Sequence, residues 1–161
     1  MTCDKCGHTV KETDLFCPHC GVELGLTALD ALTVKIKQLR RYSDLDTAYL
    51  IYKVYSEGLY LSKYTDFPEY GEREFGFKPA TIYLYKEVGE KFLDRYGNPV
   101  IPDAHFWSIG RLSELRSMPI HLIRQLMEQR ILTPLMPTKE IRAIKKECKA
   151  NKWRYLPDVI K

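Results

Sequence analysis

Four cysteines near the N-terminus have the spacing of metal ligands. Cys3 and Cys6 form one Cys-x2-Cys pair, Cys17 and Cys20 form a second, and ten residues separate the two pairs. Zinc in a structural site takes four thiolates in a tetrahedron, and two such pairs facing each other supply them without strain. The spacing therefore predicts one structural Zn²⁺ held by these four cysteines.

The surroundings of the cysteines agree with a closed site. A glycine follows the second cysteine of each pair, where the backbone must turn tightly beneath the metal. His8 and His19 lie next to the pairs, but four thiolates already fill the tetrahedron, so we expect neither to bind the ion. The segment resembles the zinc-ribbon modules at the termini of many bacterial proteins, and we assign residues 1–24 to such a ribbon. A ribbon of this size has almost no hydrophobic core, so metal binding should be what folds it. We expect the ribbon to hold a partner.

Other chemistry is not evident in the sequence. There is no glycine-rich phosphate loop, no HExxH motif and no nucleophile in a known elbow, so we expect no enzymatic activity. His105 should pack with Phe106 and Trp107. No apolar run reaches the about 20 residues that span a bilayer, and the N-terminus has no apolar stretch of a secretory signal. We therefore expect a cytoplasmic protein without membrane contact. Because cytoplasmic thiols stay reduced, its cysteines should bind metal rather than form disulfides.

Hydrophobic periodicity predicts a mainly α fold for the remainder, residues 25–161, as one helical domain. Gly25 and Leu26 form the joint to the ribbon. Thr27 and Ser43, each followed three residues later by an aspartate, have the pattern that starts a helix. The second of these helices covers the run TAYLIYKVYSEGLYL, which is apolar nearly all round, as expected of a central helix.

Three further helices are predicted in the C-terminal part, between residues 108 and 151. One begins at Ser108, one after Pro119, and the last is capped by Thr138. The last helix carries Cys148 on its apolar face, so we expect this fifth cysteine to pack in the core.

Residues 66–92 have the pattern of two helices joined by a tight turn. A first helix, capped by Asp66, ends at Phe75. The turn comprises residues 76–78, and a second helix begins at Pro79, where proline's missing N–H costs nothing. Two helices joined by a glycine-containing turn place a recognition helix in the major groove of DNA. The sequence therefore predicts a helix-turn-helix motif within the helical domain.

The second helix of this motif has an inward and an outward face. The inward stripe consists of Ile82, Tyr85, Val88, Gly89 and Phe92. On the outward face, lysine can donate to phosphate or guanine, and a threonine methyl group can contact the thymine methyl group. We assign DNA contacts on this face to Lys78, Thr81, Tyr83 and Lys86.

One position of the motif departs from the usual pattern. Glu72 lies four residues before the turn glycine, where a small inward residue is usual, whereas the small residue present is Gly71. Either the turn is shifted by one residue or the two helices cross differently.

A family resemblance rests on two segments, FPEYGEREFGFKPATIYLYKEVGEKF and FWSIGRLSELRSMPIHLIRQLMEQRILTPLMPTKEIRAIKK. They resemble helical DNA-binding proteins carried by phages, plasmids and integrative elements of bacteria. In those proteins a helix-turn-helix precedes a leucine-rich helix pair and a segment like TPLMPTKEI. The resemblance covers about residues 65–146 and implies a sequence-specific regulator of transcription, or a partitioning-type protein, that binds double-stranded DNA.

Assembly and charge bear on this interpretation. A single recognition helix covers too few base pairs for genomic specificity, so we expect a homodimer. The net charge is +4, and 23 basic against 17 acidic side chains follow residue 24. Lys145 and Lys146 on the last predicted helix could clamp phosphates, although a solvated helix face explains them equally well.

A protein partner is the alternative to DNA. Glu87 and Glu90 share the presumed recognition helix with Lys86 and would repel phosphate if they faced it. The same fold could then act as an inhibitor or adaptor, for example as an anti-CRISPR-type blocker of a host nuclease. A continuous basic surface around Lys86 would favour DNA, and an acidic or mixed surface would favour a protein.

Overall fold

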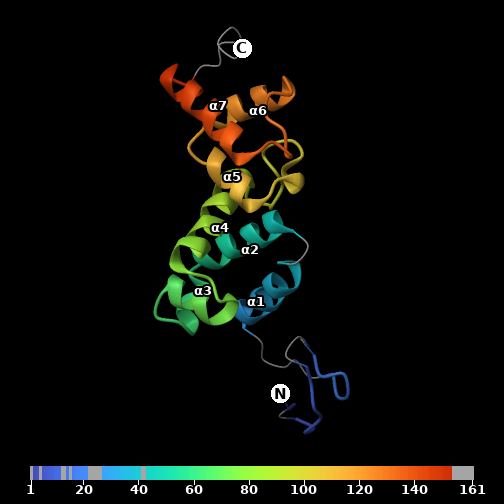
Figure 1. Ribbon diagram of the computed structural model, residues 1–161. Coiled ribbons are helices and arrows are strands. Elements are labelled where there is room, and N and C mark those ends of the chain that lie inside the picture. The colour runs from blue at the N-terminus through green and yellow to red at the C-terminus, as the bar shows by residue number, and fades with distance from the viewer. Residues whose placement is uncertain are drawn as a thin grey trace.

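The structure is a computed structural model that describes residues 2–3, 5–11, 14, 16–21, 27–40 and 43–153. Within these ranges the chain is mainly helical (Figure 1). The α-helices are α1 (Ala28–Leu39), α2 (Asp44–Ser56), α3 (Phe67–Phe75), α4 (Pro79–Phe92), α5 (Ile109–Leu115), α6 (Ile120–Glu128) and α7 (Thr138–Ala150), and two short 3₁₀ helices are η1 (Leu59–Ser62) and η2 (Ala104–Phe106). The predicted joint at Gly25 and Leu26 lies outside the described residues. No helix among the described residues combines the length and apolar character that crossing a bilayer requires.

The first two helices start where the sequence predicts. The Thr27 hydroxyl oxygen accepts the Asp30 N–H at 3.2 Å, and the Asp30 carboxylate accepts the Thr27 N–H at 3.1 Å. The Ser43 hydroxyl likewise accepts the Asp46 N–H at 3.2 Å. These side chains satisfy N–H groups that a helix start leaves unpaired.

The helix α2 is central, as predicted, but shorter than the apolar run that suggested it. It ends at Ser56, and Gly58 then takes a left-handed conformation with φ 65°, which turns the chain into η1. Among the described helices, α2 and α4 form the most extensive pair. A Cβ atom at Gly89 of α4 would lie 2.3 Å from the Ala48 carbonyl oxygen of α2, so only glycine permits this approach.

The helices α3 and α4 and the turn between them have the predicted bounds. The Asp66 carboxylate accepts the Glu69 N–H at 2.8 Å, which starts α3. Gly76 ends it with φ 67°, and the turn continues to Lys78 before Pro79 begins α4. The buried residues of α4 are the predicted ones, namely Ile82, Tyr85, Val88, Gly89 and Phe92.

The small residue between α3 and α4 is Gly71 and not Glu72. Gly71 is buried at the crossing of α3 and α4, whereas Glu72 is exposed. A Cβ atom at Gly71 would lie 2.5 Å from Ile82 Cδ1, so Gly71 is the small residue that the crossing requires. The Gly71 carbonyl oxygen also accepts the Phe77 N–H of the turn at 3.1 Å.

The helices α5, α6 and α7 extend the same hydrophobic core at the end of the chain opposite to the N-terminus (Figure 1). Cys148 is buried, at 3% exposure, as predicted. One detail differs from expectation. Thr138 is the first residue of α7 rather than its cap, because Pro137 occupies the cap position without a side-chain hydrogen bond.

Candidate metal centre and candidate nucleic-acid interface

The four cysteines converge into one group. All four Sγ atoms lie within 4.8 Å of one another. The pairs Cys3–Cys20 and Cys6–Cys17 each have their Sγ atoms 3.6 Å apart. Sulfurs about 2.3 Å from a tetrahedral zinc ion are separated by about 3.8 Å. The sulfur positions therefore fit one zinc ion.

Two matching turns place the sulfurs. The Gly7 N–H donates to the Cys3 carbonyl at 2.8 Å, and the Gly21 N–H donates to the Cys17 carbonyl at 2.8 Å. Both glycines have a positive φ, 67° and 68°, which other residues rarely adopt. The two Cys-x2-Cys segments thus form equivalent turns whose thiols face one another.

The burial and the acidity of the thiols fit a structural site. The buried cluster of this segment consists of Cys3, Val10 and Cys17, so metal binding must supply most of its folding energy. The thiols influence one another in opposite directions. The pKa of Cys17 falls to about 6, because desolvation raises it less than the backbone N–H groups of Cys20 and His19 and the neighbouring thiols lower it, whereas the pKa of Cys6 rises to about 12, because the lowering by the His8 N–H is outweighed by desolvation and the neighbouring thiols. Cys17 is therefore ready to bind a cation as a thiolate at neutral pH.

The two histidines beside the cysteines interact with each other. The rings of His8 and His19 stack, with centroids 5.1 Å apart and an angle of 18° between the ring planes. Both side chains are exposed. Within the described residues, the group of converging metal-ligand atoms consists of the four sulfurs alone.

The early turns of α4 carry three of the six residues predicted to contact DNA. Lys78 is exposed at the N-cap, and no acidic residue lies in the first turn of the helix. Thr81 is half-buried. Tyr83 is 39% exposed, and its ring packs edge-on against Phe67, with ring centroids 5.5 Å apart. These side chains form a largely accessible surface without a nearby negative charge on their own turns.

Lys86 has different surroundings. Its ammonium nitrogen lies 2.5 Å from a Glu90 carboxylate oxygen and 4.9 Å from the ring centroid of Tyr55. Only 17% of its side chain is exposed. Next to it in the sequence, the Glu87 carboxylate pairs with Arg116, the C-cap of α5. The surface around Lys86 is therefore mixed in charge, and Lys86 itself is held within the molecule.

The other two predicted contacts lie on α7. The Lys145 ammonium donates to the Glu114 carbonyl at 2.9 Å and to its carboxylate at 3.2 Å. Arg142 donates to the same carboxylate at 2.9 Å and 2.6 Å. The Arg142 hydrogen bonds, followed by Lys145, hold the pKa of Glu114 below its usual value. Lys146 is exposed. The structure thus separates the predicted DNA contacts into an α4 set and an α7 set, and it ties Lys145 to α5.

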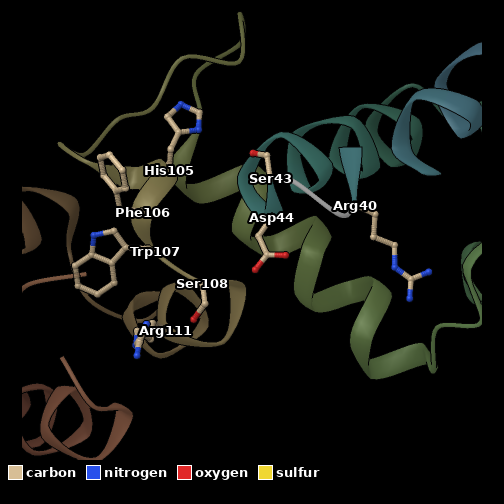
Figure 2. Close-up of a pocket in the computed structure, with 8 residues that line it drawn as sticks. All are labelled: Arg40, Ser43, Asp44, His105, Phe106, Trp107, Ser108 and Arg111. Carbon is tan, nitrogen blue, oxygen red and sulfur yellow. The ribbon is translucent and has the colours of Figure 1, made fainter. Parts of the chain in front are cut away.

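A second feature, missed by the sequence interpretation, is a hollow of about 350 Å³. Its lining residues are Arg40, Ser43, Asp44, His105, Phe106, Trp107, Ser108 and Arg111 (Figure 2). The Asp44 carboxylate accepts the Ile109 N–H at 2.9 Å and the Tyr85 hydroxyl at 3.2 Å. Burial and this carboxylate raise the pKa of Tyr85 to about 12, which keeps it a donor. Asp44 therefore joins α2, α4 and the start of α5.

The expected packing of His105 with its aromatic neighbours is wrong. Trp107 is buried at 2% exposure, but Phe106 is 73% exposed and His105 is also exposed. His105 and Phe106 lie in η2, where successive side chains are about 120° apart, and Trp107 follows as the extended C-cap. The three side chains consequently cannot pack into one cluster.

Comparisons with known proteins address the N-terminal segment. Searches of curated proteins and of solved structures return no match to this chain. Residues 1–24 match the zinc-ribbon domain family. Together with the four converging thiols, this match shows that the chain carries an N-terminal zinc ribbon with one structural zinc ion.

Proposed function

We propose that this protein binds double-stranded DNA sequence-specifically, as a transcriptional regulator or a partitioning-type protein, with α3 and α4 as a helix-turn-helix. The carrying observation is the accessible start of α4, where Lys78 lies at the N-cap and the first turn has no acid. Recognition helices contact base edges through their N-terminal residues. The close approach of Gly71 to Ile82 holds α3 against α4 and leaves that face of α4 outward.

The set of residues proposed to contact DNA is smaller than the set predicted from the sequence. Lys78 would donate to phosphate or guanine, and Thr81 and Tyr83 would reach base edges. Lys86 is left out of the proposed set because Glu90 and the Tyr55 ring already hold it. The acids Glu87 and Glu90 lie in the second half of α4, where each has a cationic partner. They therefore oppose phosphate less than the sequence suggests.

The zinc ribbon would serve assembly. Its closed set of four thiolates leaves no position for a substrate, which supports a structural role. A recognition helix of one chain covers only a few base pairs, and two copies would read two half-sites one helical turn apart. We propose a homodimer whose contact includes the ribbon.

A protein partner remains the second candidate, and one observation favours it. The surface beside Lys86 is mixed in sign, because Lys86 pairs with Glu90 and the adjacent Glu87 pairs with Arg116. Glu87, Arg116, Glu114 and Lys145 line a common hollow of about 420 Å³. Such a mixed surface suits a protein, for example a nuclease or another host effector, better than a phosphate backbone.

Binding to defined duplexes separates the two candidates. The zinc-loaded protein would be titrated against duplex DNA from around its own gene and against a scrambled duplex, at two salt concentrations. Specific recognition predicts at least about 10³-fold tighter binding to the native duplex, weakening with salt. Equal, weak binding to both duplexes would contradict the proposal and direct the search to protein partners.

A further inference from the structure

The helix α7 has an apolar face and an opposite basic face. Its buried residues are Ile141, Ile144 and Cys148. The basic face consists of Lys139, Arg142, Lys146 and Lys149, all exposed. These four positions recur at spacings of three, four and three residues, which places them along one side of an α-helix. We call this set the α7 basic stripe.

Two kinds of cation share α7. Arg142 of the stripe and its neighbour Lys145 are bound to Glu114 of α5, and they fasten α7 to that helix. Within the part of the chain that the structure describes, no hydrogen bond or ion pair joins a carboxylate to Lys139, Lys146 or Lys149. These three ammonium groups are available to an external partner.

The sequence around the three lysines does not neutralise them within the helix. Residues three or four positions away are the side-chain neighbours on an α-helix. For Lys139, Lys146 and Lys149, those positions within α7 hold other basic residues, alanine or no charged residue. Glu140 and Glu147 lie off the stripe, on an adjacent side. Like charges therefore accumulate along the stripe, and a polyanion would relieve their repulsion.

The stripe matches the phosphate backbone of a duplex in length and charge. At about 1.5 Å per residue, the span from Lys139 to Lys149 is about 15 Å. Duplex DNA carries one negative charge per about 1.7 Å of its axis, so several phosphates lie within that span. A lysine contacts phosphate as a point charge and reads no base.

We propose that α7 binds the phosphate backbone of duplex DNA through Lys139, Lys146 and Lys149, independently of base sequence, while Glu114 holds the helix in place. This contact deepens the proposed function, on which it rests for its ligand. It replaces Lys145, which the sequence interpretation selected, with two lysines on the open side of the helix. Affinity then comes from α7 and sequence preference from α4.

The salt dependence of binding tests the proposal. A triple variant, Lys139→Gln, Lys146→Gln and Lys149→Gln, would be compared with a control of equal charge loss at exposed positions outside α7 and the ribbon, Lys35→Gln, Arg95→Gln and Arg130→Gln. The slope of log K against log salt is negative, and each lost phosphate contact reduces its magnitude by about 0.9. The α7 variant should reduce the magnitude of the slope by about 2 to 3. It should weaken binding to the native and scrambled duplexes by the same factor, which leaves the ratio of the two affinities unchanged. The control should keep the wild-type slope.

The outcomes distinguish this inference from the proposed function. An α7 variant with the wild-type slope overturns the inference, while the ratio between duplexes still decides sequence specificity. A wild-type protein that binds both duplexes equally, with a slope that depends on α7, supports the inference and contradicts specific recognition. A changed ratio at an unchanged slope shows that the lysines contact bases, which overturns it. Absence of binding to either duplex overturns both.

Discussion

Gly71 and Gly89 set how closely α4 approaches its neighbours. A Cβ atom would lie 2.5 Å from Ile82 Cδ1 at Gly71, and 2.3 Å from the Ala48 carbonyl oxygen at Gly89. The obstacles at Gly71 belong to the Ile82 side chain, whose Cδ1 can move by rotation but whose Cβ, 3.0 Å away, is fixed to the backbone of α4. The obstacle at Gly89 is backbone, which moves only if the whole helix shifts.

Substitution Gly89→Ala should therefore destabilise the protein by about 1–3 kcal/mol, the usual cost of overpacking a core. Gly110→Ala is the matched control, since a Cβ atom there meets nothing within 4 Å and the residue lies in α5. The control should leave stability unchanged or raise it by up to about 1 kcal/mol, because alanine is the better helix former. Urea unfolding followed by circular dichroism measures both. Equal stability of Gly89→Ala and wild type would show that α2 and α4 are farther apart.

At the scale of helices, local signals predict more than distant ones. The caps at Thr27, Ser43 and Asp66 depend on residues three positions away, so the sequence contains them in full. The pair between Lys86 and Glu90 is also local, at four residues, and the sequence interpretation could have found it.

The sequence could not supply contacts between distant segments. The pairing of Glu87 with Arg116, and of Glu114 with Lys145, joins residues about thirty positions apart that only the packing of α4, α5 and α7 brings together. The Asp44 contact to Ile109 spans still more of the chain. For this reason the predicted DNA contacts overlooked the Glu114 partner of Lys145, whereas the Glu90 partner of Lys86 could have been found from the sequence.

The Glu114 cluster predicts a pH-dependent attachment of α7. Its pKa is lower in the folded protein, first through hydrogen bonds from Arg142, than the ordinary value of 4.5. A carboxyl group with a lowered pKa stabilises the fold above its unfolded pKa, and the effect is lost as pH falls through the folded pKa. Glu114→Gln should thus cost about 0.5–1 kcal/mol at pH 7, as expected of ion pairs that stay partly exposed, and nothing at pH 2. Unfolding at both pH values checks this, and an equal cost at both would contradict the ion pairs.

At the scale of the molecule, the described residues form two separate hydrophobic clusters, one in the ribbon and one in the helical part. The ribbon has its own small cluster around Cys3, Val10 and Cys17, whereas the buried residues of α1 to α7 form one continuous core. The sequence alone could predict the zinc site because its ligands follow a regular cysteine spacing, and the family match and the sulfur geometry agree with that prediction. The packing of the helices had no comparable signature.

Zinc removal should therefore affect the ribbon and spare the helices. Cys17→Ser, or chelation of the metal, should release the zinc ion and expose residues 1–24 to protease, while the helical circular dichroism signal stays unchanged. Cys148→Ser provides the control, because Cys148 is buried in the helical core away from the other cysteines. If the ribbon also makes the proposed dimer, light scattering should report a monomer after chelation. Loss of the helical signal would instead show that the ribbon supports the main core.

The most direct test of the proposed function is the native-to-scrambled affinity ratio of variants at the start of α4. A double variant, Lys78→Ala with Thr81→Ala, removes one donor and the hydroxyl and methyl groups of the threonine from the face proposed to read bases. Lys35→Ala with Ser117→Ala is the control on other exposed positions, outside both the ribbon and α4. The account predicts that the native-to-scrambled affinity ratio falls at least about tenfold in the α4 variant, because each good base contact contributes about 1–3 kcal/mol, and that the ratio of the control equals that of wild type. A wild-type ratio in the α4 variant would contradict the assignment of α4 as the recognition helix.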